Sequence, residues 1–468
     1  MIRILFFAWV CGSILTRMAF AQSSDDKYAL PLEDVIGILE ERYGIHIKYD
    51  AHLVAGKTLN YAAWRFRPDV DETLRNVLSP LDLKVNKEGN GKYKLKEYEY
   101  YRWEPQDGWN YLDQLAEQYH DKDSWEQRKQ QIRSDLYKAL KLEPIPAAPP
   151  STPLVTKKRK MGTYTVENFA LEIMPGLYVN GSIYKPAKSK GKLPLMLSPD
   201  GHWAGHRFRK DAQIRCAMTA QLGAVAVSYD LFGWGESTLQ FKSEDHRRSL
   251  SLAVQTLGAI RILDWMLADK NIDTERVGIC GGSGGGSHAV LMTALDDRIT
   301  LSIPVVSLSS YFYGGCPCES GLPIHTAAGG TNNVELAAMA APRPQLLISD
   351  GKDWTAHMPQ HDFPYLQKMY SYYGKVDQVE NIHLPQDGHD FGYSKRKPVY
   401  DFMSKHFRLD TKGLKNAADE YDESGCVIEE ETALYAFGRN GEKLPSNAIK
   451  GYENLKKLFK KEAYESIK

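Results

Sequence analysis

The sequence predicts a doubly wound, mostly parallel α/β sheet, preceded by a smaller α+β domain. Between residues 193 and 384, six short apolar segments typical of buried parallel strands alternate with stretches of helical periodicity. The glycine-rich segment Gly281-Gly282-Ser283-Gly284-Gly285 lies between one such strand and a helix. A G-x-S-x-G segment in this context forms a sharp turn that exposes the serine above the sheet.

Length and composition are those of an ordinary globular protein with two domains. The chain has 468 residues, of which 43% are hydrophobic and 25% are charged. Its 59 basic and 59 acidic residues cancel. The sequence therefore gives no electrostatic reason to expect nucleic acid or an anionic membrane as a partner.

The first 21 residues predict a cleaved secretory signal. Arg3 precedes an apolar segment that continues to Leu15, and Ala19-Phe20-Ala21 has the small-x-small pattern of a signal peptidase site. A membrane anchor is the alternative, but the apolar segment is short and Arg17 interrupts it, whereas a spanning helix needs about 20 apolar residues. We expect a periplasmic or secreted protein.

Residues 27–98 predict a self-contained α+β module. Helical spacing and strand-like alternation follow one another twice: a helix over 30–39, a strand over 45–49, a helix over 69–78, and strands at 83–85 and 93–95 around the turn at 89–91. Three segments, 32–35, 43–47 and 74–83, resemble the short N-terminal module of secretins and TonB-dependent receptors. The resemblance implies docking to an outer-membrane receptor or another envelope protein; a generic packing module is the alternative.

The second domain is predicted over residues 107–460. Charge-rich helices over 110–142 and an extended, proline-rich connector over 144–153 lead into an antiparallel strand pair at 164–166 and 177–179. The predicted parallel strands follow at 193–197, 224–228, 277–280, 303–306, 345–348 and 379–384. A helix is predicted over 250–267, with Leu257, Ile260, Leu263 and Met266 along one face.

Ser283 is the candidate nucleophile, and the loops after two later strands supply its candidate partners. Such a serine needs a base that takes its proton and a carboxylate that orients the base. His389 follows the last predicted strand, and Asp353 follows the strand before it, with Asp350 as the alternative acid. Their order along the chain, serine, acid and histidine, is that of one large class of serine hydrolases.

An oxyanion formed at Ser283 would need N–H donors already in place. We expect the amide of Gly284 to be one donor. The second should come from the loop over residues 198–205, where His202 or Trp203 would donate.

Residues 110–460 resemble the secreted α/β-hydrolases of the acetyl xylan esterase-like family. The segments that support the resemblance are 200–203, 229–235, 281–286, 316–321, 331–333, 351–355 and 388–390. The family implies the α/β-hydrolase fold and ester hydrolysis without a cofactor. It says much less about which ester is cleaved.

Substrate contacts are predicted from aromatic and cationic residues at the strand ends. Trp203, Tyr311 and Trp354, together with Trp234 and Tyr313, could form a rim on which sugar rings stack, or could be ordinary loop packing. Arg207 could pair with a uronate carboxylate, together with Arg209 and Arg215. The alternative is that these arginines are solvated helix residues.

The cysteines do not predict a metal site. Five would remain after removal of the signal, an odd number that cannot all pair within one molecule: Cys216, Cys280, Cys316, Cys318 and Cys426. Near Cys316-Pro317-Cys318 the sequence has one histidine, His325, and no second cysteine pair. A local disulfide and two pocket-lining thiols are the interpretations left open.

Together these observations predict a serine carbohydrate esterase that removes acetyl groups from plant polysaccharides or oligosaccharides. A methylesterase acting on uronate or pectin esters is the first alternative. A serine peptidase and a non-catalytic, receptor-associated binding protein are further alternatives. The binding protein is disfavoured by the intact Ser283, Asp353 and His389, and the peptidase by the lack of any propeller-like segment before the hydrolase domain.

Overall fold

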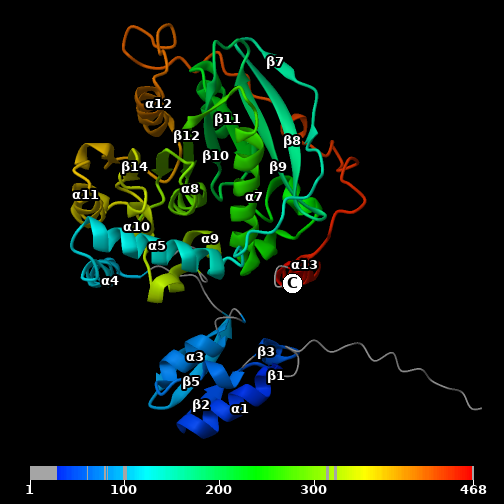
Figure 1. The fold of residues 1–468 in the computed structure, drawn as a ribbon, viewed down its shortest axis with the longest axis vertical. Coiled ribbons are helices and arrows are strands. Elements are labelled where there is room, and N and C mark those ends of the chain that lie inside the picture. The colour runs from blue at the N-terminus through cyan, green and yellow to red at the C-terminus, as the bar shows by residue number, and fades with distance from the viewer. Residues whose placement is uncertain are drawn as a thin grey trace, which may run out of the picture. The chain divides into compact units, whose positions relative to one another are not determined.

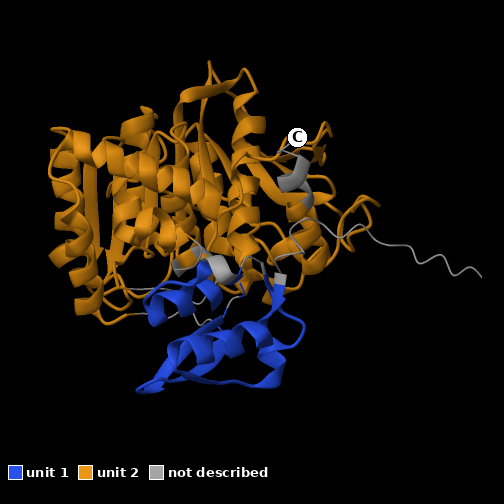
Figure 2. Ribbon diagram, turned by 60° about the horizontal axis from the view of Figure 1, so that its bottom comes forward, with its two compact units in different colours: residues 1–99 blue, residues 100–468 orange. Residues whose placement is uncertain are grey.

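The computed structural model describes residues 29–60, 62–78, 81, 83–97, 103–311, 316–320 and 324–465. The chain divides into two compact units, residues 1–99 and 100–468 (Figure 2). The predicted domains cover 27–98 and 107–460, and the predicted signal segment, 1–21, lies outside the described residues.

The first unit is a small α+β domain. Its helices are α1 (Leu32–Tyr43), α2 (Ala51–Val54) and α3 (Val70–Leu78), and its strands are β1 (Ala29–Pro31), β2 (His46–Lys48), β3 (Thr58–Asn60), β4 (Leu83–Gly89) and β5 (Lys92–Glu97). Strands β4 and β5 form the predicted antiparallel hairpin, and β2 adds in parallel to β5. Leu39 of α1 and Val77 of α3 are fully buried in its core.

The second unit contains the predicted large sheet (Figure 1). Its strands are β6 (Leu154–Val155), β7 (Arg159–Met161), β8 (Tyr164–Met174), β9 (Leu177–Pro186), β10 (Leu193–Pro199), β11 (Val225–Tyr229), β12 (Ile272–Gly282), β13 (Leu301–Val305), β14 (Gln345–Asp350) and β15 (Val379–Leu384). The order is β15-β14-β13-β12-β10-β11-β9-β8-β6, with β7 beside β8. The neighbouring strands β15, β14, β13, β12, β10 and β11 are parallel to one another, and β8 and β9 are antiparallel as predicted.

Helices cover both faces of this sheet. They are α4 (Pro105–Ala116), α5 (Lys122–Ala139), α6 (Lys210–Gln221), α7 (Leu250–Leu267), α8 (Gly284–Leu295), α9 (Pro317–Ser320), α10 (Asn333–Ala338), α11 (Phe363–Ser371), α12 (Tyr393–Phe407) and α13 (Tyr452–Glu465). Helices α5, α7, α8, α10 and α11 share one hydrophobic core, and α6 and α12 share another.

Successive side chains of one strand belong to different hydrophobic cores. Leu195 and Leu197 of β10 face the first core, whereas Met196 between them faces the second. Successive side chains of a strand point to opposite faces, so a strand that is buried on both faces is apolar throughout. This explains why the parallel strands are continuous apolar segments in the sequence.

Helix α7 is the longest apolar helix of the described residues. It is long and apolar enough to cross a membrane by length and composition, but most of it is buried inside the second unit. Its apolar residues on all sides fit a helix in the core of a large α/β domain.

We predict that a shortened chain beginning at Tyr100 folds without the first unit, because each unit has its own hydrophobic core. Circular dichroism should show retained helix and strand content, and thermal unfolding should be a single cooperative transition. An unfolded product would show that the second unit depends on the first.

Candidate active site

Ser283 lies at the turn between β12 and α8, in a backbone conformation that few residues adopt. Its φ is 54° and its ψ is −127°. The neighbouring glycines leave no room for a side chain, because an ideal Cβ on Gly281 would be 2.3 Å from the Gly285 carbonyl oxygen. A Cβ on Gly285 would be 2.6 Å from the Pro199 carbonyl oxygen. The G-x-S-x-G glycines are therefore required by close backbone approach, and the strained turn holds the serine in place.

The structure brings Ser283, His389 and Asp353 together. His389 Nε2 lies 2.9 Å from Ser283 Oγ, and His389 Nδ1 lies 2.7 Å from Asp353 Oδ2. Asp353 follows β14 and His389 follows β15, which are adjacent parallel strands, so their loops meet at one edge of the sheet. In the neutral imidazole with Nδ1–H directed at Asp353, Nε2 can accept the serine proton.

Asp353 is held as a carboxylate by its hydrogen bonds. Its side chain is 2% exposed, and burial alone would raise its pKa. Hydrogen bonds from His389 and from the Thr355 amide and hydroxyl outweigh burial and lower the pKa of Asp353. An ionised Asp353 can orient His389 and stabilise its positive charge.

Asp350, the alternative acid, does not contact His389 but faces Lys395. The two side chains are fully buried and lie 3.5 Å apart. Burial, followed by repulsion from Asp353, raises the pKa of Asp350. Lys395 also donates to the Gly388 carbonyl at 2.6 Å and to Asp390 at 2.9 Å, which places it directly behind the loop that contains His389.

The predicted oxyanion loop lies against the nucleophile. An ideal Cβ on Gly201 would be 2.8 Å from Ser283 Cβ, so this loop passes as close as a glycine allows. Asp200, which begins the loop, is bound by Arg209 at 2.8 Å and lies 3.6 Å from Arg215. Both arginines, expected as solvated residues or substrate ligands, instead fix the loop that contains His202 and Trp203.

Two of the predicted aromatic residues lie beside His389. The rings of Trp354 and Trp203 have centroids 4.2 Å and 5.3 Å from that of His389. Tyr311 is only 4% exposed and packs instead against Trp109 and His357, from α4 and the loop before α11. Tyr313 lies outside the described residues.

The prediction that Arg207 binds substrate is wrong. Its side chain is 1% exposed, and its guanidinium donates to Asp230 at 2.7 Å, to Ser182 at 2.9 Å and to the Leu434 carbonyl at 3.1 Å. Glu236 completes the ion-pair group at 3.4 Å. Arg207 thus joins the sheet to the C-terminal segment and has no donor facing the nucleophile.

The structure places two histidines beside Cys316 that the sequence does not reveal. They are His202 and His246, and the three side chains form a compact cluster. The expectation of a single histidine near Cys316 is therefore wrong. His325, the histidine nearest to Cys316 in the sequence, bonds Asn333 at 2.8 Å instead. The side chain of Cys318 is outside the described residues, so the interpretations of the Cys316-Pro317-Cys318 segment that involve it stay predictions.

Comparison with known proteins shows the family. The family model for glucuronyl esterases of fungi matches residues 240–317, which include Ser283. The solved structure of the methylesterase BT1017 is 49% identical, covers 95% of this chain and 99% of that chain, and has a TM-score of 0.74. The chain belongs to the family of this methylesterase. The predicted α/β-hydrolase fold is confirmed, and the protein is an ester hydrolase.

More distant similarities were also found. A putative acetyl xylan esterase from Bacteroides fragilis is 15% identical, with 66% of this chain and 87% of that chain covered and a TM-score of 0.48. A glucuronoyl esterase from Solibacter usitatus is 17% identical, with 61% and 93% covered and a TM-score of 0.46. An uncharacterized 31.7 kDa protein of Escherichia coli is 32% identical over 79 residues, which are 17% of this chain and only 26% of that protein.

We predict that Asp353→Asn and Asp350→Asn have different effects. Asp353→Asn should lower kcat for p-nitrophenyl acetate by about 10⁴-fold, because an amide favours the wrong tautomer of His389. Asp350→Asn should mainly lower the melting temperature, since it removes the one carboxylate that is fully buried with Lys395 and leaves Lys395 paired with the more exposed Asp390 at 2.9 Å. Steady-state kinetics and thermal unfolding of both variants test this, and the reverse ranking in kcat would make Asp350 the acid.

Proposed function

We propose that this protein is a serine carbohydrate esterase that hydrolyses methyl esters of uronic acid residues. The observation on which the proposal rests is the hydrogen-bonded series Ser283, His389 and Asp353, with distances of 2.9 Å and 2.7 Å. Membership of the family of the methylesterase BT1017 supports the choice of ester.

The proposed reaction has two steps. Ser283 Oγ attacks the ester carbonyl while His389 Nε2 takes its proton, and the proton then passes to the departing methanol. Water, deprotonated by His389, attacks the acyl-enzyme and releases the uronate and the free serine. The amide of Gly284 and an amide of the loop containing His202 and Trp203 are the proposed donors to the oxyanion.

The comparisons favour the methyl ester over the acetyl ester. A methyl ester has methanol as its alcohol part, so the sugar of a carbohydrate methyl ester is on the acyl side. A glucuronyl ester also has its sugar acid on the acyl side, and the matched family model is for glucuronyl esterases. Both similarities support an acyl site that admits a sugar ring. Acetyl removal, the first choice from the sequence, stays a prediction that the same experiment tests.

Trp203 and Trp354 are the proposed contacts for the sugar. Their ring centroids lie 5.3 Å and 4.2 Å from that of His389, the proposed base. Flat indole faces bind the apolar faces of sugar rings. With Arg207 buried, recognition of neighbouring carboxylates would have to come from other groups.

The export of the chain and the role of its first unit are also proposals. We infer that the chain is exported after cleavage following Ala21, on the pattern of residues 1–21. We infer that the first unit, an α+β domain with its own core, docks to an outer-membrane receptor or another envelope protein, on the resemblance of its sequence to the secretin and TonB receptor module. Neither proposal affects the chemistry at Ser283.

We predict that Ser283→Ala and His389→Ala each abolish hydrolysis of p-nitrophenyl acetate. Each loss should be about 10⁶-fold in kcat, because the two residues act as a unit. The double variant should be no slower than either single variant, which stopped assays at high enzyme concentration can measure. Turnover near that of the unaltered enzyme in either single variant would refute the mechanism.

We predict that the enzyme releases methanol from methyl-esterified pectin faster than it releases acetate from acetylated xylan. Both products are assayed after incubation with equal enzyme, and Ser283→Ala is the control for contaminating esterases. Acetate without methanol would refute the methylesterase proposal and restore the acetyl prediction. Release of neither product, with p-nitrophenyl acetate still hydrolysed, would refute both ester assignments and leave the serine mechanism intact.

A further inference from the structure

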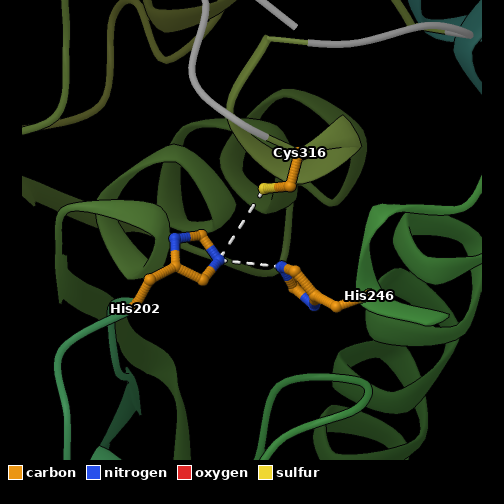
Figure 3. Close-up of side chains that lie close together, drawn as sticks. All are labelled: His202, His246 and Cys316. Carbon is orange, nitrogen blue, oxygen red and sulfur yellow. Dashed lines mark hydrogen bonds between the residues drawn. The ribbon is translucent and has the colours of Figure 1, made fainter. Parts of the chain in front are cut away.

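Three potential metal ligands from separate segments meet beside the oxyanion loop (Figure 3). His202 belongs to that loop, His246 to the short 3-10 helix Ser243–Arg247, and Cys316 directly precedes α9. His202 Nε2 lies 2.8 Å from His246 Nε2 and 3.7 Å from Cys316 Sγ. All three candidate ligand atoms lie within 4.8 Å of one another, and His246 and Cys316 are buried.

In each of the two histidines, Nδ1 bonds a group outside the cluster, and this bond determines the protonation of Nε2, the nitrogen that faces the cluster. His246 Nδ1 lies 2.6 Å from the Phe232 carbonyl oxygen, which can only accept a hydrogen bond, so Nδ1 must be the donor. His202 Nδ1 lies 3.1 Å from the Glu319 carboxylate, which when ionised imposes the same tautomer. In the neutral rings both Nε2 lone pairs then face each other at 2.8 Å. Such an arrangement requires a positive charge between them, either a proton or a metal ion.

The third group favours the metal ion. A cysteine sulfur beside two imidazole nitrogens is a donor set that zinc binds, with Zn–N of about 2.0–2.1 Å and Zn–S of about 2.3 Å. Nitrogen and sulfur ligands of one tetrahedral zinc ion are about 3.6 Å apart by this geometry, close to the 3.7 Å between Cys316 and His202. The two nitrogens would have to separate by about 0.5 Å, which small rotations of the rings allow.

The groups that bond Nδ1 of the two histidines are also those expected at a metal site. Metal-binding histidines commonly donate their other ring N–H to a carboxylate or a backbone carbonyl, which fixes the ring and raises its basicity. Glu319 and the Phe232 carbonyl stand in these two positions.

We propose that His202, His246 and Cys316 bind one Zn²⁺ ion, with Cys316 as the thiolate and its proton released to solvent. Three protein ligands leave one position of the tetrahedron for water or another ligand. The ring of His202 lies against Gly284, since an ideal Cβ there would be 2.3 Å from His202 Cε1. The ion therefore acts as a positioning group: it ties the oxyanion loop to the 3-10 helix and to α9, next to the nucleophile.

Elemental analysis of the purified full-length protein, after incubation with Zn²⁺ and removal of excess metal, tests the site. We expect about one zinc per chain, and a loss of at least tenfold in bound zinc for Cys316→Ser and for His246→Gln. Cys426→Ser and His120→Gln are matched controls outside the cluster and should retain the metal. With Co²⁺ instead of Zn²⁺, the thiolate-to-cobalt absorption should be present in the controls and lost in Cys316→Ser.

Two results would overturn the proposal. Less than a tenth of an equivalent of zinc in the unaltered protein would show that a proton joins the two histidines instead. Equal zinc content in Cys316→Ser and Cys426→Ser would place the metal elsewhere. Because metal content is measured without any substrate, these results are independent of the proposed ester specificity.

The positioning role has its own readout. Removal of zinc by a chelator should lower kcat for p-nitrophenyl acetate at least tenfold with a smaller change in KM, and added Zn²⁺ should restore it. Unchanged kcat and melting temperature after full removal would refute the positioning role.

Discussion

Close backbone approach at Ser283 is the constraint on which the rest of the site depends. The serine has a φ of 54°, and the loop after β10 passes within contact distance of its Cβ at Gly201. A side chain at Gly201 would push the oxyanion loop away from Ser283. A side chain at Gly281 would push the nucleophile turn away from the first turn of α8, and one at Gly285 would push that first turn away from the end of β10. The fully buried strands on either side hold the strained turn in place, because they cannot move apart without opening the core.

The parts of the site that depend on sheet topology could be predicted from the sequence. Parallel strands bring their carboxyl ends to one edge, so residues that follow different strands become neighbours whatever their separation in the chain. His389 and Asp353 each follow a strand that the apolar pattern identifies, and the structure places them in hydrogen-bond contact. Helix α7 was predicted with its observed limits because Leu257, Ile260, Leu263 and Met266 recur at helical spacing along one face.

The parts that depend on side-chain partners could not be predicted in this way. Arg207 follows the oxyanion loop in the sequence, yet its partners come from β9, from the segments after β11 and from the 3-10 helix Glu431–Leu434. His246 lies 44 residues from the ring that it contacts. Composition and periodicity determine which elements pack, but not which polar groups meet in the space between them, since a displacement of one or two ångströms makes or breaks each contact.

Two buried ion pairs each lie behind a loop of the active site, and this position explains why charged residues are buried there. Lys395 and Asp350 lie behind the loop of His389, and Arg209 with Asp200 lies behind the oxyanion loop. Burying such charges costs several kcal/mol per ion, so apolar residues of equal volume would stabilise the fold about as well. Apolar residues would not direct a loop, whereas Lys395 donates to the Gly388 carbonyl next to His389 and so fixes the backbone there. The buried charges therefore contribute geometry rather than net stability, and each group serves one of the two loops that must keep its place while the charge at Ser283 changes.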